Sequence, residues 1–261
     1  MTPILSARGL AWRVAARRGT PGTTIVEGVS FDLHAGEFVA LMGRNGAGKS
    51  TVMDLLAGLR RPHEGAVRLD GRSLQDWTAP ARARRIAHLP QAVRGASPMT
   101  AAEIVMMGRY AHAGGWRPSV ADRAAVAHAM HECGCARYRD RPLLTLSGGE
   151  RQRVLLAACI AQEPAVLLLD EPSTFLDVDQ QLQTFALLRD TVARGGACIA
   201  VTHDINLALT FCSRVIVLAE RSIARDMDAR TAAADDGWLG AFSPRLRRIA
   251  VSEGQSWVAY R

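Results

Sequence analysis

The sequence predicts an α/β fold, and three observations indicate this class. Residues 38–42 form a short apolar run that leads through a glycine-rich stretch into a helix-like segment. Residues 165–169 are a continuous apolar run, typical of a parallel strand buried on both faces, and residues 197–202 predict another buried strand. Residues 92–145 are rich in alanine and carry helix-capping residues. We therefore expect a core of parallel strands with a helical insertion.

Length and composition limit the possible classes of protein. The chain has 261 residues, 48% of them hydrophobic, which suits one large domain or a core with a subdomain. Its apolar runs fall short of the ~20 residues that span a bilayer, and its first residues lack the pattern of a secretory signal. Five cysteines without zinc spacing fit reduced core thiols. These features predict a cytosolic protein.

The chain is basic, with a net charge of +7 and an isoelectric point of about 9.8. Nucleic acid or an anionic membrane surface attracts such a charge. The arginines are spread along the chain, however, with short groups at 17–18, 82–85 and 245–248. We interpret them mainly as solvated faces, with contact near lipid headgroups as the lesser alternative.

Residues 4–40 alternate short strand-like runs, at 4–10, 24–29 and 30–33, with turns, which predicts a small antiparallel β region before the glycine-rich stretch. That stretch, GRNGAGKST, has the spacing of a phosphate-binding loop, with Gly43, Gly48, Lys49 and Ser50 in place. Glycines let consecutive N–H groups point at phosphate oxygens, and the following helix N-terminus favours anions. Lys49 is the one lysine of the chain and can reach the β- and γ-phosphates. Ser50 can bind Mg²⁺; an ordinary glycine-rich turn is the alternative.

Two residues outside this loop also fit a nucleotide site. Trp12 lies upstream of the loop, where an aromatic ring can stack on adenine. A core or surface tryptophan is the other interpretation. Gln91 follows the strand-like residues 86–89 and Pro90, and its amide can reach Mg²⁺ or an attacking water. The alternative for Gln91 is a plain strand cap.

The alanine-rich part predicts helices from Thr100, with Glu103 completing a capping box, and from Ser119. His and Cys residues cluster near the end of the second helix and suggest a metal site. Cys-Gly-Cys is poor zinc geometry, however, so we favour a structural role for this cluster. Its members are His128, His131, Cys133 and Cys135.

A second glycine-rich turn, Ser147-Gly148-Gly149, precedes a clear helix over residues 153–162. Such a turn can bind an anion at a helix N-terminus. In isolation, a glycine-capped turn without a ligand is the better interpretation.

Two carboxylates, Asp170 and Glu171, follow the apolar run 165–169. Ligands of α/β sheets bind at the carboxyl ends of the strands. Asp170 would bind Mg²⁺ through water, and Glu171 would activate the attacking water as general base. His203 follows the next apolar run and can hydrogen-bond a γ-phosphate. A pair of loop acids and a structural histidine are the alternatives.

Together and in this order, these motifs resemble the ATP-binding subunit of an ABC transporter over nearly the whole chain. GRNGAGKS resembles Walker A, VLLLDEP resembles Walker B, and LSGGERQ resembles the family signature. LPQ, ending at Gln91, resembles the Q-loop, and residues 173–177 the D-loop, with Phe175 where alanine is more usual. His203 resembles the switch histidine, and Trp12 stands where the family has an adenine-stacking aromatic.

The resemblance implies a single domain over residues 1–261, with a P-loop NTPase core, an antiparallel β subdomain and a helical subdomain at about 92–160. It also implies roles for the remaining motif residues. Those residues are Arg44, Asn45, Gly46, Ala47 and Thr51 for ATP, Glu150 with the signature, and Asp177 in the D-loop.

The resemblance further implies the cofactors and partners. Two copies would sandwich two ATP molecules with Mg²⁺, the signature of one copy facing the P-loop of the other. The dimer would sit at the cytoplasmic face of the inner membrane, on permease subunits that receive cargo from a substrate-binding protein. A non-transport ABC ATPase acting on nucleic acid or ribosomes is the rival. The single cassette and the lack of a coiled-coil insertion count against it, so we expect no nucleic acid.

Within the family, residues 99–112 and 202–209 resemble importers of ferric siderophores, haem or cobalamin. The short spacing from signature to Walker B favours the siderophore branch. Two features depart from the family pattern. An arginine usual in the signature helix is absent at residues 157–159, and the usual turn glycine after Leu218 is absent from residues 219–221.

Overall fold

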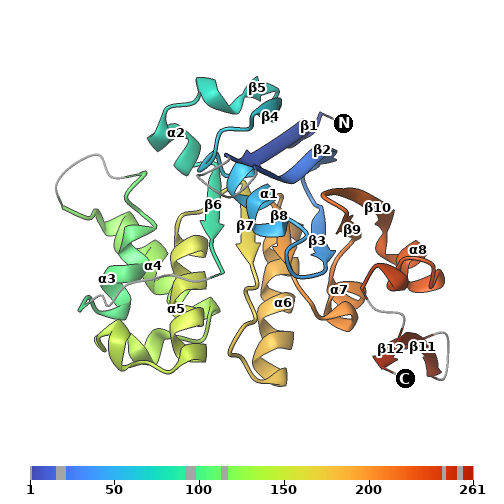
Figure 1. Ribbon diagram of the computed structural model, residues 1–261. Coiled ribbons are helices and arrows are strands. Elements are labelled where there is room, and N and C mark those ends of the chain that lie inside the picture. Colours follow the sequence, from blue (N-terminus) through green and yellow to red (C-terminus); the bar gives the residue numbers. More distant parts are fainter. Residues whose placement is uncertain are drawn as a thin grey trace.

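The computed structural model describes residues 2–15, 22–91, 98–112, 117–242, 245–251 and 255–260. Its central sheet has the strand order β10-β9-β3-β8-β7-β6 (Figure 1). The strands from β9 to β6 in this order are parallel, and β10 is antiparallel to β9. The strand bounds are Phe38–Gly43 for β3, Ile86–Leu89 for β6, Val166–Asp170 for β7, Ala197–Val201 for β8, Arg214–Ala219 for β9 and Ser222–Asp228 for β10.

The parallel arrangement follows from the apolar runs in the sequence. Every residue of β3, β7 and β8 is buried, as expected for strands covered on both faces. Strands β3, β8 and β7 are neighbours and parallel. The glycine-rich loop after β3 and the acidic pair at the end of β7 therefore emerge at the same edge of the sheet. This edge positions the candidate site.

A second sheet is antiparallel and has the order β2-β1-β4-β5, as predicted for the N-terminal region. Helix α1, Lys49–Leu56, buries Val52, Leu55 and Leu56 in one apolar core with both sheets. In Figure 1 it lies below the antiparallel sheet and against the central strands. The strands are Leu5–Val14 (β1), Thr23–Leu33 (β2), Glu64–Leu69 (β4) and Arg72–Ser73 (β5).

Between β6 and β7 the chain forms a helical lobe, on the left in Figure 1. Helices α3 and α4 both pack against α5. All three begin with a capping box, in which a Ser or Thr side chain and an acidic residue satisfy each other's backbone N–H. The bounds are Ala101–Met107 for α3, Val120–Glu132 for α4 and Gly148–Ala161 for α5, with short 3₁₀ turns at Ala136–Tyr138 and Leu143–Thr145.

A buried ion pair fastens the lobe. Arg109 Nε lies 3.0 Å from Asp122 Oδ1, and both side chains are 9% exposed. Arg109 also donates to the carbonyl oxygen of Ala161 at 2.8 Å and to Glu163 at 2.7 Å. The guanidinium therefore joins the end of α3, the start of α4 and the end of α5.

The start of α5 differs from the prediction. The sequence placed the first helical residue at 153, because two glycines disfavour a helix, whereas the helix begins at Gly148. Ser147 accepts a hydrogen bond from the Glu150 N–H, and the Glu150 side chain accepts one from the Ser147 N–H. This capping offsets the low propensity of the glycines.

The C-terminal part completes the molecule with a hairpin that packs on α7. Asn206 of α7 bonds Val258 of β12 in both directions, with Val258 N–H donating at 2.9 Å. No helix of the described part is long and apolar enough to cross a membrane. The remaining elements are α2 (Ala79–Ala83), α6 (Val178–Ala193), α7 (Ile205–Phe211), α8 (Ala229–Ala234), β11 (Leu246–Val251), β12 (Gln255–Tyr260) and two 3₁₀ turns at Leu74–Asp76 and Leu239–Ala241.

Candidate nucleotide-binding and hydrolysis site

The glycine-rich loop between β3 and α1 requires glycine at two places. Gly43 has φ 146°, and a Cβ there would lie 2.4 Å from the Leu218 carbonyl oxygen. Gly48 has φ 97°, and a Cβ there would lie 2.8 Å from the Ile25 carbonyl oxygen. Neither position can accept a side chain without backbone movement. The loop is therefore clamped between β9 and β2, and α1 begins directly after it.

Lys49 is the first residue of α1 and is 7% exposed. Its ammonium donates to the carbonyl oxygens of Gly43 at 2.8 Å and Arg44 at 3.1 Å, closing the loop on itself. Burial lowers the pKa of Lys49, and the nearby charges of Glu171 and Asp170 partly oppose this. A partly desolvated ammonium at a helix N-terminus is suited to bind phosphate.

Asp170 ends β7 and is 3% exposed. Burial raises the pKa of its carboxyl, and a hydrogen bond with Ser50 acts in the opposite direction. Strand β7 packs against α1, and Asp170 and Ser50 line the same cavity. Hydroxyl and carboxylate oxygens together are ligands that Mg²⁺ accepts.

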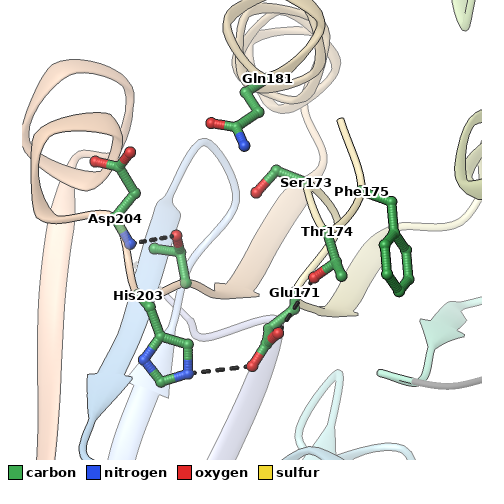
Figure 2. Close-up of a pocket in the computed structure, with 8 residues that line it drawn as sticks. Glu171, Ser173, Thr174, Phe175, Gln181, His203 and Asp204 are labelled. Atoms are coloured by element: carbon green, nitrogen blue, oxygen red, sulfur yellow. Dashed lines mark hydrogen bonds and ion pairs between the residues drawn. The ribbon is translucent and has the colours of Figure 1, made fainter. Parts of the chain in front are cut away.

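Glu171 lies at the centre of the polar cluster (Figure 2). Its Oε1 accepts a hydrogen bond from Gln91 Nε2 at 3.0 Å and lies 3.1 Å from His203 Nε2. Its Oε2 accepts one from Thr174 Oγ1 at 3.2 Å. The backbone of Glu171 is left-handed, with φ 54°. Strained backbone of this kind is found at functional sites.

These groups line one open cavity of about 540 Å³ at the sheet edge. The structure thus brings together residues that are up to 178 positions apart in the sequence, counting from Ile25 to His203. Its lining includes Asn45, Gly46, Gly48, Lys49, Ser50, Thr51, Gln91, Asp170, Glu171 and His203. The cavity therefore combines hydrogen-bond donors that can bind phosphate, oxygen atoms that can bind a metal ion, and a carboxylate that can accept a proton.

Trp12 does not line this cavity. It lies on β1, where the Arg60 guanidinium stands 4.6 Å from its ring centre and the His63 ring 6.0 Å away. Arg60 is itself paired with Asp54 at 2.7 Å. The structure therefore gives Trp12 a cation–π contact, and stacking on adenine stays a prediction.

The signature residues lie apart from the cavity of their own chain. Ser147, Gly148, Gly149 and Glu150 form the start of α5, and none of them lines the cavity. Asp177 caps α6 by accepting from the Gln180 N–H at 2.9 Å. The metal hypothesis for the His and Cys cluster finds no support, because no group of three metal-ligating side chains occurs in the described part of the chain.

Two residues near the carboxylates, Gln152 and Thr174, were not predicted as site residues from the sequence. Gln152 Nε2 donates to the carbonyl oxygens of Glu171 and Pro172, both at 3.3 Å, so it links the signature helix to the strand end that carries the carboxylates. Thr174 holds the side chain of Glu171. Gln152 belongs to the quoted LSGGERQ motif, which is the signal that could have drawn attention to it.

The fold and the cavity define a P-loop nucleotide hydrolase, and comparison with known proteins gives the family. A family model described as ABC transporter matches residues 26–174. The ATP-binding cassette MJ0796, solved as a dimer with ADP and phosphate, superposes with a TM-score of 0.79 at 26% identity, covering 87% of this chain and 99% of that one. A metal-chelate type ABC transporter shares the fold, with a TM-score of 0.79 at 24% identity over 100% of this chain and 97% of that one.

Curated relatives also indicate the ABC transporter family. The hemin import ATP-binding protein HmuV of Streptomyces coelicolor is 44% identical, over 78% of this chain and 72% of that protein. HmuV of Pseudomonas aeruginosa is 42% identical, over 78% and 80%. The cobalamin import ATP-binding protein BtuD of Halobacterium salinarum is 37% identical, over 86% and 56%. The chain belongs to the ABC transporter family and is an ATP-binding cassette that hydrolyses ATP.

Proposed function

We propose that this chain is the ATPase subunit of an ABC importer whose cargo is an iron chelate. The observation that carries the proposal is the identity of 42–44% to proteins named for the import of hemin. Haem is the first candidate, because the haemin relatives show the higher identity. A ferric siderophore is the second, because the short spacing between signature and Walker B fits that branch.

The proposed chemistry assigns a role to each side chain of the cavity. Lys49 and the N–H groups of residues 43–51 bind the ATP phosphates. Ser50, Asp170 and Gln91 offer oxygen ligands that suit Mg²⁺, which would neutralise charge between the phosphates. Ser50, Asp170 and Gln91 line the same cavity, so the donor set fits this ion.

Glu171 would act as general base on the attacking water. Its Oε1 is engaged by Gln91 and His203 in this structure. Movement of these two side chains toward the nucleotide would free the carboxylate for a water molecule. His203 would then hydrogen-bond the γ-phosphate, and Gln91 would face the metal ion.

Assembly follows from the separation of the two glycine-rich turns. We infer that a second copy supplies Ser147 to Gly149, so that two chains related by a twofold axis complete two sites. The dimeric MJ0796 cassette supports this arrangement. The permease would hold the dimer peripherally at the cytoplasmic face of the membrane, and a substrate-binding protein would deliver the cargo on the other side.

Growth on defined iron sources tests the cargo. Deletion of the gene should abolish growth on haem as sole iron source, and wild-type plasmid should restore it, whereas a Glu171→Gln plasmid should not. Loss of growth on a ferric siderophore with normal use of haem would select the second candidate. Normal growth on both, with loss of cobalamin uptake or co-purification with nucleic acid, would reject iron-chelate import.

A further inference from the structure

Phe175 is an aromatic residue on the surface loop between β7 and α6. Its side chain is 77% exposed, and its backbone is left-handed, with φ 68°. Left-handed backbone is costly for a residue other than glycine, and an exposed aromatic ring gains little from burial within its own chain.

The ring of Phe175 marks the position of the signature turn. A Cβ built on Gly148 would lie 3.0 Å from Phe175 Cγ, so the ring rests on the first residue of α5. The Phe175 carbonyl oxygen would lie 2.8 Å from a Cβ on Gly149. In the view of Figure 2, the Phe175 ring and the His203 ring lie on opposite sides of Glu171. A molecule that covers the signature turn must therefore also meet this ring.

A cavity of about 360 Å³ lies beside the phosphate-binding loop and adjoins the cavity of Lys49, with which it shares Asn45 and His203. One wall consists of Gly43, Arg44 and Asn45, with His203 beside them. The other wall is apolar and comes from Ile205 of α7 and from Phe242 and Leu246 in the C-terminal segment. Phe242 is fixed by an edge contact with the buried Trp238, at 5.6 Å between ring centres.

We propose that Phe175 of each copy inserts into this cavity on the other copy when two chains close on ATP. The inference rests on the proposed dimer, in which the signature turn of one chain faces the phosphate-binding loop of its partner. Phe175 travels with the signature turn, and the cavity borders the phosphate-binding loop. Face-to-face pairing of the two loops therefore brings the exposed ring to the apolar cavity, and the twofold axis repeats the contact.

The chemistry of the two surfaces matches. Ile205, Phe242 and Leu246 offer apolar and aromatic contacts to a phenyl ring. Arg44 at the rim can place its guanidinium over the ring face. Buried aromatic anchors of this kind carry much of the energy of protein interfaces. The contact would make the C-terminal segment, through Phe242 and Leu246, part of the ATP-dependent interface.

Dimer formation by the Glu171→Gln protein in saturating ATP tests the proposal, with light scattering as the measurement. Adding Phe175→Ala should raise the protein concentration at half-dimerisation at least ~10-fold, which corresponds to 1.4 kcal/mol, while ATP affinity of the monomer stays unchanged. Phe175→Leu should recover part of the loss. Tyr110→Ala is the matched control, because Tyr110 is also an exposed aromatic, at 83%, and should have no effect.

Cross-linking tests the contact itself. The five native cysteines are free and buried, so Phe175→Cys with Phe242→Cys should give an ATP-dependent dimer with a short bismaleimide. Val120→Cys with Phe242→Cys, which pairs the cavity with the helical lobe, should give none. If Glu171→Gln fails to dimerise with ATP, both the proposed dimer and this contact are rejected. If it dimerises, but Phe175→Ala dimerises equally well and no cross-link forms, the Phe175 contact alone is rejected.

Discussion

Glu171 is held by side chains from three separate segments, Gln91, Thr174 and His203, and its charge is the property on which hydrolysis should depend. Glu171→Gln preserves the shape and removes the basicity. We expect ATP hydrolysis to fall at least ~100-fold, the usual range for loss of a general base, while ATP binding persists. Phosphate release and nucleotide titration measure the two effects.

Thr174→Ala is the matched control for this prediction. It removes one hydrogen bond to Glu171 and leaves the carboxylate in place. We expect a much smaller loss of hydrolysis than in Glu171→Gln. Near-normal turnover by Glu171→Gln would show that another group activates the water.

At the residue scale, the sequence predicts groups that depend on local motifs. Lys49, Ser50 and Asp170 could be placed because a loop or a strand end fixes each of them relative to its neighbours. The contact between Gln152 and the Glu171 carbonyl joins segments through tertiary packing, and so does the contact of Phe175 with Gly148. Neither contact leaves a periodic pattern in the sequence.

The turn between β9 and β10 is strained. Glu220 and Arg221 both have left-handed backbone, with φ 48° and 72°, where a hairpin of this type prefers Asn-Gly. Arg221→Gly should stabilise the protein by about 0.5–1 kcal/mol. Relief of ~1–2 kcal/mol of left-handed strain is partly offset by the entropy of glycine, ~0.5–1 kcal/mol.

Urea unfolding measures this change. Arg225→Gly is the control, because Arg225 lies within β10 on the exposed face and glycine should destabilise the strand there. Equal destabilisation by both variants would contradict the interpretation of the turn as strained.

The buried ion pair of Arg109 and Asp122 makes the stability of the folded protein depend on pH. Hydrogen bonds from the Ser119 hydroxyl and N–H, together with that of Arg109, lower the pKa of Asp122 from 3.8 to about 2. The folded state therefore binds the proton more weakly than the unfolded state does. The stabilisation from Asp122 is fully present above about pH 5 and is lost as the pH falls toward 2.

Asp122→Asn should lower the unfolding temperature at pH 7, since Arg109 then loses its buried counter-charge. The difference from the wild type should shrink as the pH is lowered from 5 toward 2. Scanning calorimetry across this range measures it. A constant difference would mean that the carboxylate charge of Asp122 contributes nothing to stability.

For helices and strands, the kind of element was easier to predict from the sequence than its first and last residues. The parallel strands were evident because complete burial leaves uninterrupted apolar runs, as in β7 and β8. The sequence divided β2 into residues 24–29 and 30–33, whereas the strand is continuous from Thr23 to Leu33 with Gly28 at φ 66°. Pairing with β1 maintains the strand across this irregularity, and such pairing is not visible in the strand's own residues.

For the whole molecule, the central question is whether the signature acts in trans. Two inactive variants, Lys49→Ala and Ser147→Arg, can be mixed with the permease present. A mixed dimer places both defects in one site and leaves the other intact, so some ATPase activity should return. If the signature acts in cis, every site keeps one defect and no activity returns.

Strict coupling between the two sites would hide this recovery. In that case, Glu171→Gln is added to both chains to block hydrolysis, and the number of ATP molecules retained by each mixed dimer is measured. One ATP per mixed pair supports the arrangement in trans, and none rejects it.

The order of the strands in the central sheet is harder to predict from the sequence than the residues of the candidate site. The placement of β8 between β3 and β7 depends on which apolar runs pair, and several orders satisfy the same burial pattern. The turn-forming residues 253–256 of the sequence indicate a possible final hairpin, which β11 and β12 form, although 253 and 254 lie outside the described residues. Its attachment to α7 through Asn206 was not expected, because one polar side chain carries it.

The single lysine gives the chain a chemical property of practical use. An amine-selective acylating reagent has Lys49 as its one side-chain target, so its reaction would report on the nucleotide site and on bound ATP. Burial, by lowering the pKa of Lys49, increases the fraction of reactive neutral amine near pH 8, although it also restricts access. A lysine-specific protease would cut the unfolded chain once, between residues 49 and 50, separating β1 to β3 from all that follows.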